Sequence, residues 1–269
     1  MTPSFALSRW FRPSFARCLI CDRDAGSPQR HHTAPPVRHP EAQAILRSLC
    51  RSCSEAIPWI AAPVCRICGR PEVCPDCPRR VRRHVVFCRS AVRYDSNMRE
   101  LLARYKYRGS EKLAPLMAAM LAFAYERVVR ETAGHGFHAI TSVPLARERL
   151  EERGFNQAEQ MARRIAEWYG ISYVPLLQRN RHTEKQSLKN RRRRLQDMKG
   201  NFMLARPEQL QALKSQHPGP LRLLLVDDIY TTGSTMNECA AAVCRDGAIF
   251  NNSSILAPTT IHGLLWARS

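Results

Sequence analysis

LRLLLVDDIYTTGST, residues 221–235, is the stretch of this sequence that decides its fold. It opens with a short apolar run bounded by a proline and two acids, which is typical of a buried strand rather than a helix. The adjacent carboxylates Asp227 and Asp228 end that run, and a turn of small residues follows. Residues 236–248 then read as a helix that Gly247 closes. We therefore predict a strand, a polar turn and a helix in succession.

The predicted turn has the chemistry of an anion site. Its backbone N–H groups, its hydroxyls and the N-terminus of the following helix all favour negative charge. Gly233 allows the backbone to approach a ligand closely. The turn is not a Walker A loop, because it lacks the G-x-x-x-x-G-K-[ST] pattern. Its members are Thr231, Thr232, Gly233, Ser234 and Thr235.

The acid pair makes the stretch more specific. Asp227 and Asp228 lie just ahead of the turn, where their carboxylates can accept hydrogen bonds from two neighbouring hydroxyls such as a ribose diol. A phosphate in the turn and a diol on the acids describe a ribose 5-phosphate. Two alternatives stay open, namely a strand–helix unit with no ligand and acids that bind a metal or accept a phosphoryl group.

The charge balance favours anionic partners. The chain has 269 residues, of which 42 are Lys or Arg and 23 are Asp or Glu, giving a net charge of +19. Such a balance indicates phosphates, nucleic acid or an acidic surface as partners, with a soluble basic protein as the alternative. No run of eighteen apolar residues occurs, so we expect no membrane span. Residues 1–17 read as a basic leader of a cytoplasmic protein.

Eight of the eleven cysteines form four C-x-x-C pairs before residue 80. Each pair supplies half of a tetrahedral all-thiolate site, so sequential pairing predicts two structural Zn²⁺ sites in a double zinc-ribbon domain, residues 18–83. Redox pairs, free thiols and iron–sulfur ligation are the alternatives. We expect the intervening His31, His32 and His39 to be solvated. The first predicted site is Cys18, Cys21, Cys50 and Cys53, and the second is Cys65, Cys68, Cys74 and Cys77.

Across residues 84–269 the pattern alternates between strands and helices, which predicts an α/β domain with a parallel sheet. Ligands of such sheets bind beyond the carboxyl ends of the strands. The loops at Pro144 and Asp227 should therefore open on the same edge. We expect a polar loop at 206–220, strands at 85–94, 139–144, 171–177 and 201–205, and helices at 97–109, 111–131 and 158–170.

A basic run at residues 179–199 holds nine Lys or Arg and two acids. Its four consecutive arginines, Arg191, Arg192, Arg193 and Arg194, would cover every side of a helix, so packing in a dry core is not expected. Nucleic-acid phosphates or the diphosphate of a ligand suit this charge, and a solvated helix face is the alternative.

The motifs, taken in order, resemble one family. They are the C-x-x-C pairs, YKYRG at 105–109, SVPLARERLEERGFNQ at 142–157, EKQS at 184–187 and LLLVDDIYTTGST at 223–235. The last resembles the phosphoribosyl diphosphate (PRPP) motif of type I phosphoribosyltransferases. Together the motifs resemble the ComF family of late-competence proteins, related to GntX, over about residues 15–248.

This resemblance implies a zinc ribbon joined to a type I phosphoribosyltransferase fold that binds PRPP with Mg²⁺. Asp227 and Asp228 would act as the catalytic acids and hold the ribose hydroxyls, while residues 231–235 would cradle the 5-phosphate. Lys106, Arg147, Arg153 and Lys185 would lie on the pyrophosphate side. The family pattern ends after Gly247, because residues 251–254 are polar where an alternating terminal strand is expected.

Three functions are considered. The first is a phosphoribosyltransferase acting in DNA uptake and natural transformation, whose acceptor is left open because no base-reading hood is evident. The second is a non-catalytic PRPP-sensing or DNA-binding adaptor of the competence machinery, in which Arg191 to Arg194 and the zinc ribbon contact single-stranded DNA. A third function is a zinc-ribbon adaptor that docks to other competence proteins.

Overall fold

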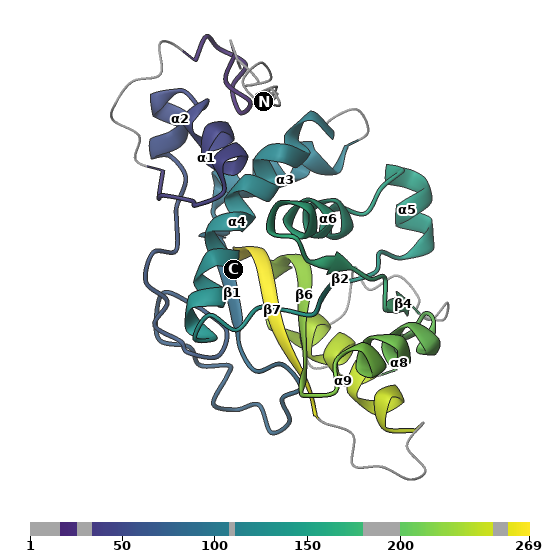
Figure 1. Ribbon diagram of the computed structural model, residues 1–269. Helices are drawn as coiled ribbons and strands as arrows, with labels where there is room; N and C mark the ends of the chain where they lie inside the picture. Colours follow the sequence, from purple (N-terminus) through teal and green to yellow (C-terminus); the bar gives the residue numbers. More distant parts are fainter. Residues whose placement is uncertain (1–16, 26–33, 108–110, 180–199, 250–257) are drawn as a thin grey trace, which may run out of the picture.

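The structure, a computed structural model, describes residues 17–25, 34–107, 111–179, 200–249 and 258–269 (Figure 1). Helices and strands alternate after the cysteine-rich segment, as predicted. The helices are α1 (Pro40–Arg47), α2 (Arg51–Glu55), α3 (Ser96–Lys106), the 3-10 turn η1 (Glu111–Leu113), α4 (Ala114–Glu131), α5 (Arg147–Arg153), α6 (Gln157–Tyr169), α8 (Pro207–Gln216) and α9 (Ser234–Ile249). The strands are β1 (Cys88–Arg93), β2 (Ala139–Ser142), β3 (Ser172–Tyr173), β4 (Leu177–Arg179), β5 (Phe202–Leu204), β6 (Leu221–Tyr230) and β7 (Thr259–Arg268).

Five parallel strands form the main sheet, in the order β1-β7-β6-β2-β3. Strand β6 has partners on both sides, and its side chains alternate between two cores. Leu224 and Val226 lie in the core that contains α4 and α6, whereas Leu223 and Leu225 lie in the core that contains α9 (Figure 1). A strand buried on both faces reads as a continuous apolar run, which explains the sequence of β6. The predicted α/β architecture, a parallel sheet flanked by helices, is confirmed.

The strand ends define a single functional edge. Ser142 of β2 lies opposite Val226 of β6, and the N–H of Val143 donates to the carbonyl of Val226 at 2.9 Å. The loop after β2 and the acids of β6 therefore begin at the same level of the sheet. The prediction that these two loops open on one edge is confirmed.

Local sequence signals lie at the starts of two helices. Asp95 caps α3, because its carboxylate accepts from the N–H of Met98 at 2.8 Å. Pro115 lies in the first turn of α4, where its missing N–H costs nothing. Helix α4 is largely buried, as its apolar sequence predicts.

Four predictions of secondary structure are wrong. Helix α3 ends at Lys106 rather than Gly109, and α9 runs past Gly247 to Ile249. Residues 206–220 are not a loop but contain α8, which begins at a proline and buries Leu210 and Leu213 one turn apart. The expected strand 171–177 is divided between β3 and β4.

The terminal strand, which the polar residues 251–254 had placed in doubt, is present as β7. It lies between β1 and β6 and pairs with both along its length. Its apolar residues 264–267 are fully buried, with Trp266 the largest. Residues 251–254 themselves lie outside the described part of the chain. Pairing with two neighbouring strands therefore decides the conformation of β7.

The two cysteine groups pack on different cores. Cys18 lies in the core with Ile45 of α1 and with α4, whereas Cys68 and Cys77 lie in the core with α9. The two groups therefore flank opposite faces of the sheet. One histidine expected to be solvated is not, because His39 stacks on Trp168 with ring centroids 5.1 Å apart. His31 and His32 lie outside the described residues.

We expect Trp266→Ala to lower the free energy of unfolding by about 3–5 kcal/mol, since it removes a fully buried indole from a central strand. Urea denaturation monitored by circular dichroism measures this change. Val81→Ala is the control, because Val81 is 96% exposed and its truncation should change stability by less than about 0.5 kcal/mol. Equal stability of the two variants would contradict the central place of β7.

Candidate functional site

The acid pair lies near the end of strand β6, which continues past the acids to Tyr230. The carboxylate of Asp227 accepts from the N–H of Asp228 at 2.9 Å, and that of Asp228 accepts from the N–H of Ile229 at 2.7 Å. Burial, followed by the charge of Asp228, raises the pKa of Asp227 well above its usual range. Backbone N–H groups therefore offset part of the negative charge of the pair, and a nearby cation can offset more of it.

One basic residue predicted for the pyrophosphate side contacts this pair, and the charge of the pair acts on a second. Lys106, in the last turn of α3, brings its Nζ to 2.6 Å from Oδ2 of Asp228. Arg153, at the end of α5, donates to Oε1 of Gln157 at 3.1 Å. Burial and the charge of Arg149 lower the pKa of Arg153, and Asp228 opposes that shift, which places Arg153 within electrostatic range of the acid. Elements distant in sequence therefore supply positive charge to one acid.

Arg147 is not brought to the acids. It opens α5 and pairs with Glu151 one turn later at 2.8 Å, and both side chains are more than 60% exposed. In this arrangement it lies on the solvent side of the loop after β2. A role on the pyrophosphate side would require it to leave Glu151.

Asn156 is a site residue for which the sequence prediction assigned no role. Its Nδ2 donates to the carbonyl of Val143 at 3.0 Å, and its Oδ1 accepts from the N–H of Ala158 at 3.1 Å. It thereby caps α6 and holds the loop that follows β2. An asparagine directly before an amphipathic helix is an N-cap signal, so the position was recognisable from the sequence.

The turn after β6 has the geometry expected of a phosphate loop. Gly233 has φ of +76°, and a Cβ placed there would overlap the ring of Tyr230, so glycine is required. The hydroxyls of Thr232 and Ser234 lie 2.8 Å apart. Helix α9 begins at Ser234, so the N–H groups of its first turn have no acceptor within the helix. The N–H groups of the loop, the hydroxyls and the helix dipole at this turn all favour negative charge.

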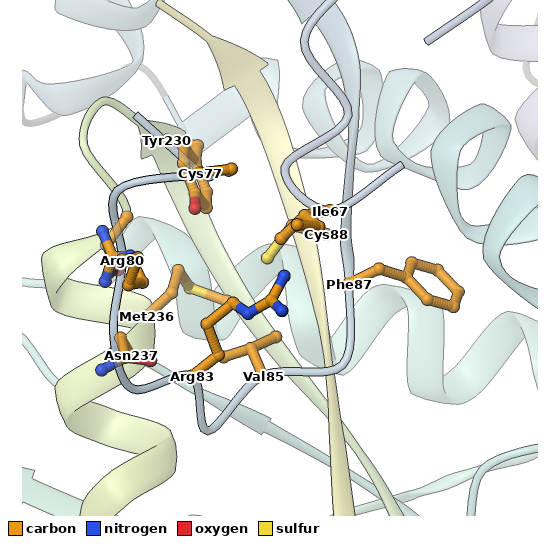
Figure 2. Close-up of a pocket in the computed structure, with 11 residues that line it drawn as sticks. Ile67, Cys77, Arg80, Arg83, Val85, Phe87, Cys88, Tyr230, Met236 and Asn237 are labelled. Carbon is orange, nitrogen blue, oxygen red and sulfur yellow. Dashed lines mark hydrogen bonds between the residues drawn. The ribbon is translucent and has the colours of Figure 1, made fainter. Parts of the chain in front are cut away.

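A second residue outside the predicted set supports this loop from behind. Arg80 donates from Nη1 to the carbonyl of Gly233 at 3.3 Å, and from Nη2 to the carbonyl of Thr232. Figure 2 shows Arg80 beside the start of α9, at a small pocket that Tyr230 and Met236 also line. No local sequence signal distinguishes Arg80 from the arginines beside it.

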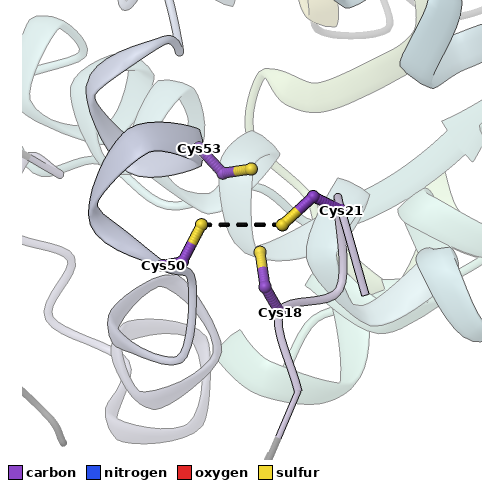
Figure 3. Close-up of side chains that lie close together, drawn as sticks. All are labelled: Cys18, Cys21, Cys50 and Cys53. Atoms are coloured by element: carbon purple, nitrogen blue, oxygen red, sulfur yellow. Dashed lines mark hydrogen bonds between the residues drawn. The ribbon is translucent and has the colours of Figure 1, made fainter. Parts of the chain in front are cut away.

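Both predicted cysteine groups are assembled. In each, the four sulfur atoms lie within 4.8 Å of one another, and Figure 3 shows those of the first group turned toward a common centre. The Sγ atoms of Cys21 and Cys50 are 3.7 Å apart, and those of Cys68 and Cys74 are 3.6 Å apart. Four thiolates about 2.3 Å from a zinc ion are about 3.8 Å from each other, so these spacings fit tetrahedral Zn²⁺.

The cysteine pKa values agree with cation sites. Although burial acts in the opposite direction, hydrogen bonds with Ser52 and Cys53 lower the pKa of Cys50 to about 6. Burial and the neighbouring sulfurs raise the pKa of Cys53. One thiolate therefore forms readily, whereas complete ionisation of the group needs a bound cation to offset the repulsion.

Several predicted residues lie outside the part of the chain that the structure describes. These are Lys185, Arg191, Arg192, Arg193 and Arg194. Within the described residues, no helix is both long and apolar enough to cross a membrane.

Together these residues combine groups that favour an anion with carboxylate acceptors. The loop and helix N-terminus suit a phosphate, and the acids suit hydroxyl donors or a divalent cation. Lys106 and Arg153 add positive charge on the same edge of the sheet. A phosphorylated sugar carries the complementary groups, namely a phosphate anion and hydroxyl donors.

Comparisons with known proteins find relatives along most of the chain. No family model matches the chain. The chain is 28% identical to competence protein ComFC of Bacillus subtilis over 246 residues, 88% of this chain and 92% of that protein. It is 28% identical to competence protein ComFC of Streptococcus pneumoniae over 236 residues, 86% and 95% of the two chains. It is 29% identical to the DNA utilization protein YhgH of Salmonella typhimurium over 205 residues, 74% and 86%. Over most of its length the chain is therefore similar to competence proteins ComFC and to a DNA utilization protein YhgH, which supports its resemblance to the ComF family.

Proposed function

We propose that this chain binds PRPP at the carboxyl end of β6 and serves in DNA uptake. The observation that carries the proposal is the succession of acid pair, Gly233 turn and helix α9, with Lys106 at the acids. The turn would bind the 5-phosphate and the acids the ribose hydroxyls. Relatives named for competence and DNA utilization support the biological role.

Mg²⁺ would be held by oxygen atoms, namely carboxylates of the acid pair and the diphosphate, and would offset the leaving group's charge. In this proposal Lys106 and Arg153 contact the diphosphate. Asp227 and Asp228 orient the ribose and favour positive charge on its ring. Those roles suit both a transferase and a protein that only senses PRPP.

We expect PRPP with Mg²⁺ to give a clear binding isotherm by titration calorimetry. The double variant Asp227→Asn/Asp228→Asn should bind about 10- to 100-fold more weakly, because charged acceptors for the ribose hydroxyls are lost. Glu167→Gln is the control, since Glu167 pairs with Arg164 on the exposed side of α6. No heat with folded wild-type protein, or equal affinity in the acid variant, would refute the site.

Turnover distinguishes the two forms of the proposal. Release of pyrophosphate when PRPP is mixed with candidate nitrogen acceptors identifies a transferase. Tight PRPP binding without pyrophosphate release across the acceptor set identifies a sensor or adaptor.

We propose that both cysteine groups hold structural Zn²⁺. Purified protein should therefore contain about two zinc ions per chain, as measured by inductively coupled plasma mass spectrometry. Cys18→Ser and Cys65→Ser should each lower the content to about one. Cys244→Ser is the control, because Cys244 belongs to neither group. Iron in place of zinc, or unchanged content in both serine variants, would overturn this assignment.

We also propose contact with single-stranded DNA through Arg191 to Arg194. Replacing all four by glutamine should reduce the slope of log affinity against log salt by up to about 3, since each phosphate neutralised contributes about 0.7. Fluorescence anisotropy with a labelled oligonucleotide at several salt concentrations measures the slope.

The matched control changes the same charge elsewhere. Arg51, Arg130, Arg163 and Arg164 lie on α2, α4 and α6, and their replacement by glutamine removes four positive charges from other surfaces. An equal fall in slope for both quadruple variants would show that net charge, rather than the arginine run, determines DNA binding.

A further inference from the structure

The second cysteine group lies directly behind the phosphate loop. Arg80 follows Cys77 by three residues, and its N–H donates to the carbonyl of Cys77 at 3.3 Å. Its guanidinium then reaches the carbonyls of Thr232 and Gly233. One residue therefore joins the turn that carries a metal-ligand cysteine to the backbone of the loop.

Arg268 forms a second connection from the end of β7. It is 4% exposed and donates from Nη2 to Sγ of Cys68 at 3.7 Å and from Nη1 to the carbonyl of Tyr230 at 3.1 Å. Its guanidinium also lies over the Tyr230 ring, 4.8 Å from the centroid. That ring fills the space beside Gly233 in which a Cβ would collide. The cysteine group therefore contacts the loop through packed, buried side chains.

The carbonyls that Arg80 binds determine where the loop's donors point. The carbonyl of Thr232 and the N–H of Gly233 belong to one planar peptide, and in a trans peptide they point in opposite directions. The same holds for the carbonyl of Gly233 and the N–H of Ser234. By holding two carbonyls on one side, Arg80 directs two N–H groups toward the other side, where an anion would bind. Its positive charge also polarises both peptides in the sense that favours an anion.

We propose that the second cysteine group, acting through Arg80 and Arg268, positions the phosphate loop, so that metal in this group and sugar phosphate in the loop bind cooperatively. The proposal rests on the proposed function for its ligand. Figure 2 shows part of this connection, with Cys77 beside Tyr230 and Arg80 next to α9. Arg80 is a positioning residue, because its donors are engaged on the loop's carbonyl side.

The first test concerns Arg80 and uses amide hydrogen exchange together with calorimetry. Arg80→Ala should speed exchange in a peptide covering residues 231–237 and weaken PRPP binding roughly tenfold, with zinc content unchanged. Arg80→Lys should restore little of the loop's protection from exchange or of the PRPP affinity, because a lysine lacks the planar fork that reaches two carbonyls. Arg79→Ala, a change at the exposed neighbour, should match wild type in both measurements.

The second test concerns the metal. Cys65→Ser should lose one zinc ion and speed exchange in the same peptide, whereas Cys18→Ser should lose one zinc ion on the other face of the sheet and leave that peptide protected. Equal effects of the two cysteine variants would overturn the coupling. Unchanged exchange in Arg80→Ala, or full recovery in Arg80→Lys, would overturn the positioning role.

The exchange measurement requires no ligand, so it separates this inference from the proposed function. If wild-type protein binds no PRPP while Arg80→Ala still loosens the loop, the ligand assignment fails and loop positioning stands. If PRPP binds with equal affinity to wild type and Arg80→Ala, the PRPP site stands and the cooperativity fails.

Discussion

The burial of β6 on both faces is the constraint on which the rest of the structure depends. Its apolar residues contribute alternately to two cores, so the strand cannot shift by one residue without exchanging them. This fixed register places Asp227 and Asp228 at the carboxyl edge of the sheet, level with the end of β2. The acids are half-buried only because the strand that carries them is held in the middle of the molecule.

The sequence was most informative where chemistry is local. The succession of apolar run, acid pair, small-residue turn and helix is contiguous, and the cysteine pairs are recognised by their spacing. The order of strand, turn and helix and both cysteine groups were therefore predicted, although β6 continues past the acids to Tyr230. Lys106 was identified through the family pattern, and its ion pair with Asp228 confirms that α3 returns to the acids. Arg153 also lies near the acid pair, whereas Arg147 pairs with Glu151 at the surface.

The features that the sequence missed depend on contacts between distant segments. Arg80 and Arg268 resemble any other arginine in the sequence, and only the fold brings them behind the loop. Strand β7 was obscured by the polar residues ahead of it, and pairing on both sides determines its conformation. Helix α8 was missed because its buried face is narrow, with only Leu210 and Leu213 inside.

The electrostatics of the acids suggest how an ion pair and a ligand can share one site. A carboxylate has several lone-pair positions, and Lys106 uses those on Oδ2 of Asp228 while the N–H of Ile229 uses Oδ1. Ribose hydroxyls are neutral donors, so under the proposed function they can bind the acids without displacing the ammonium group. The ammonium group has three N–H donors and can contact diphosphate oxygens while it still faces Asp228. Lys106 would then link the acid that holds the sugar to the diphosphate, which explains why a pyrophosphate-side lysine is found against a sugar-side carboxylate.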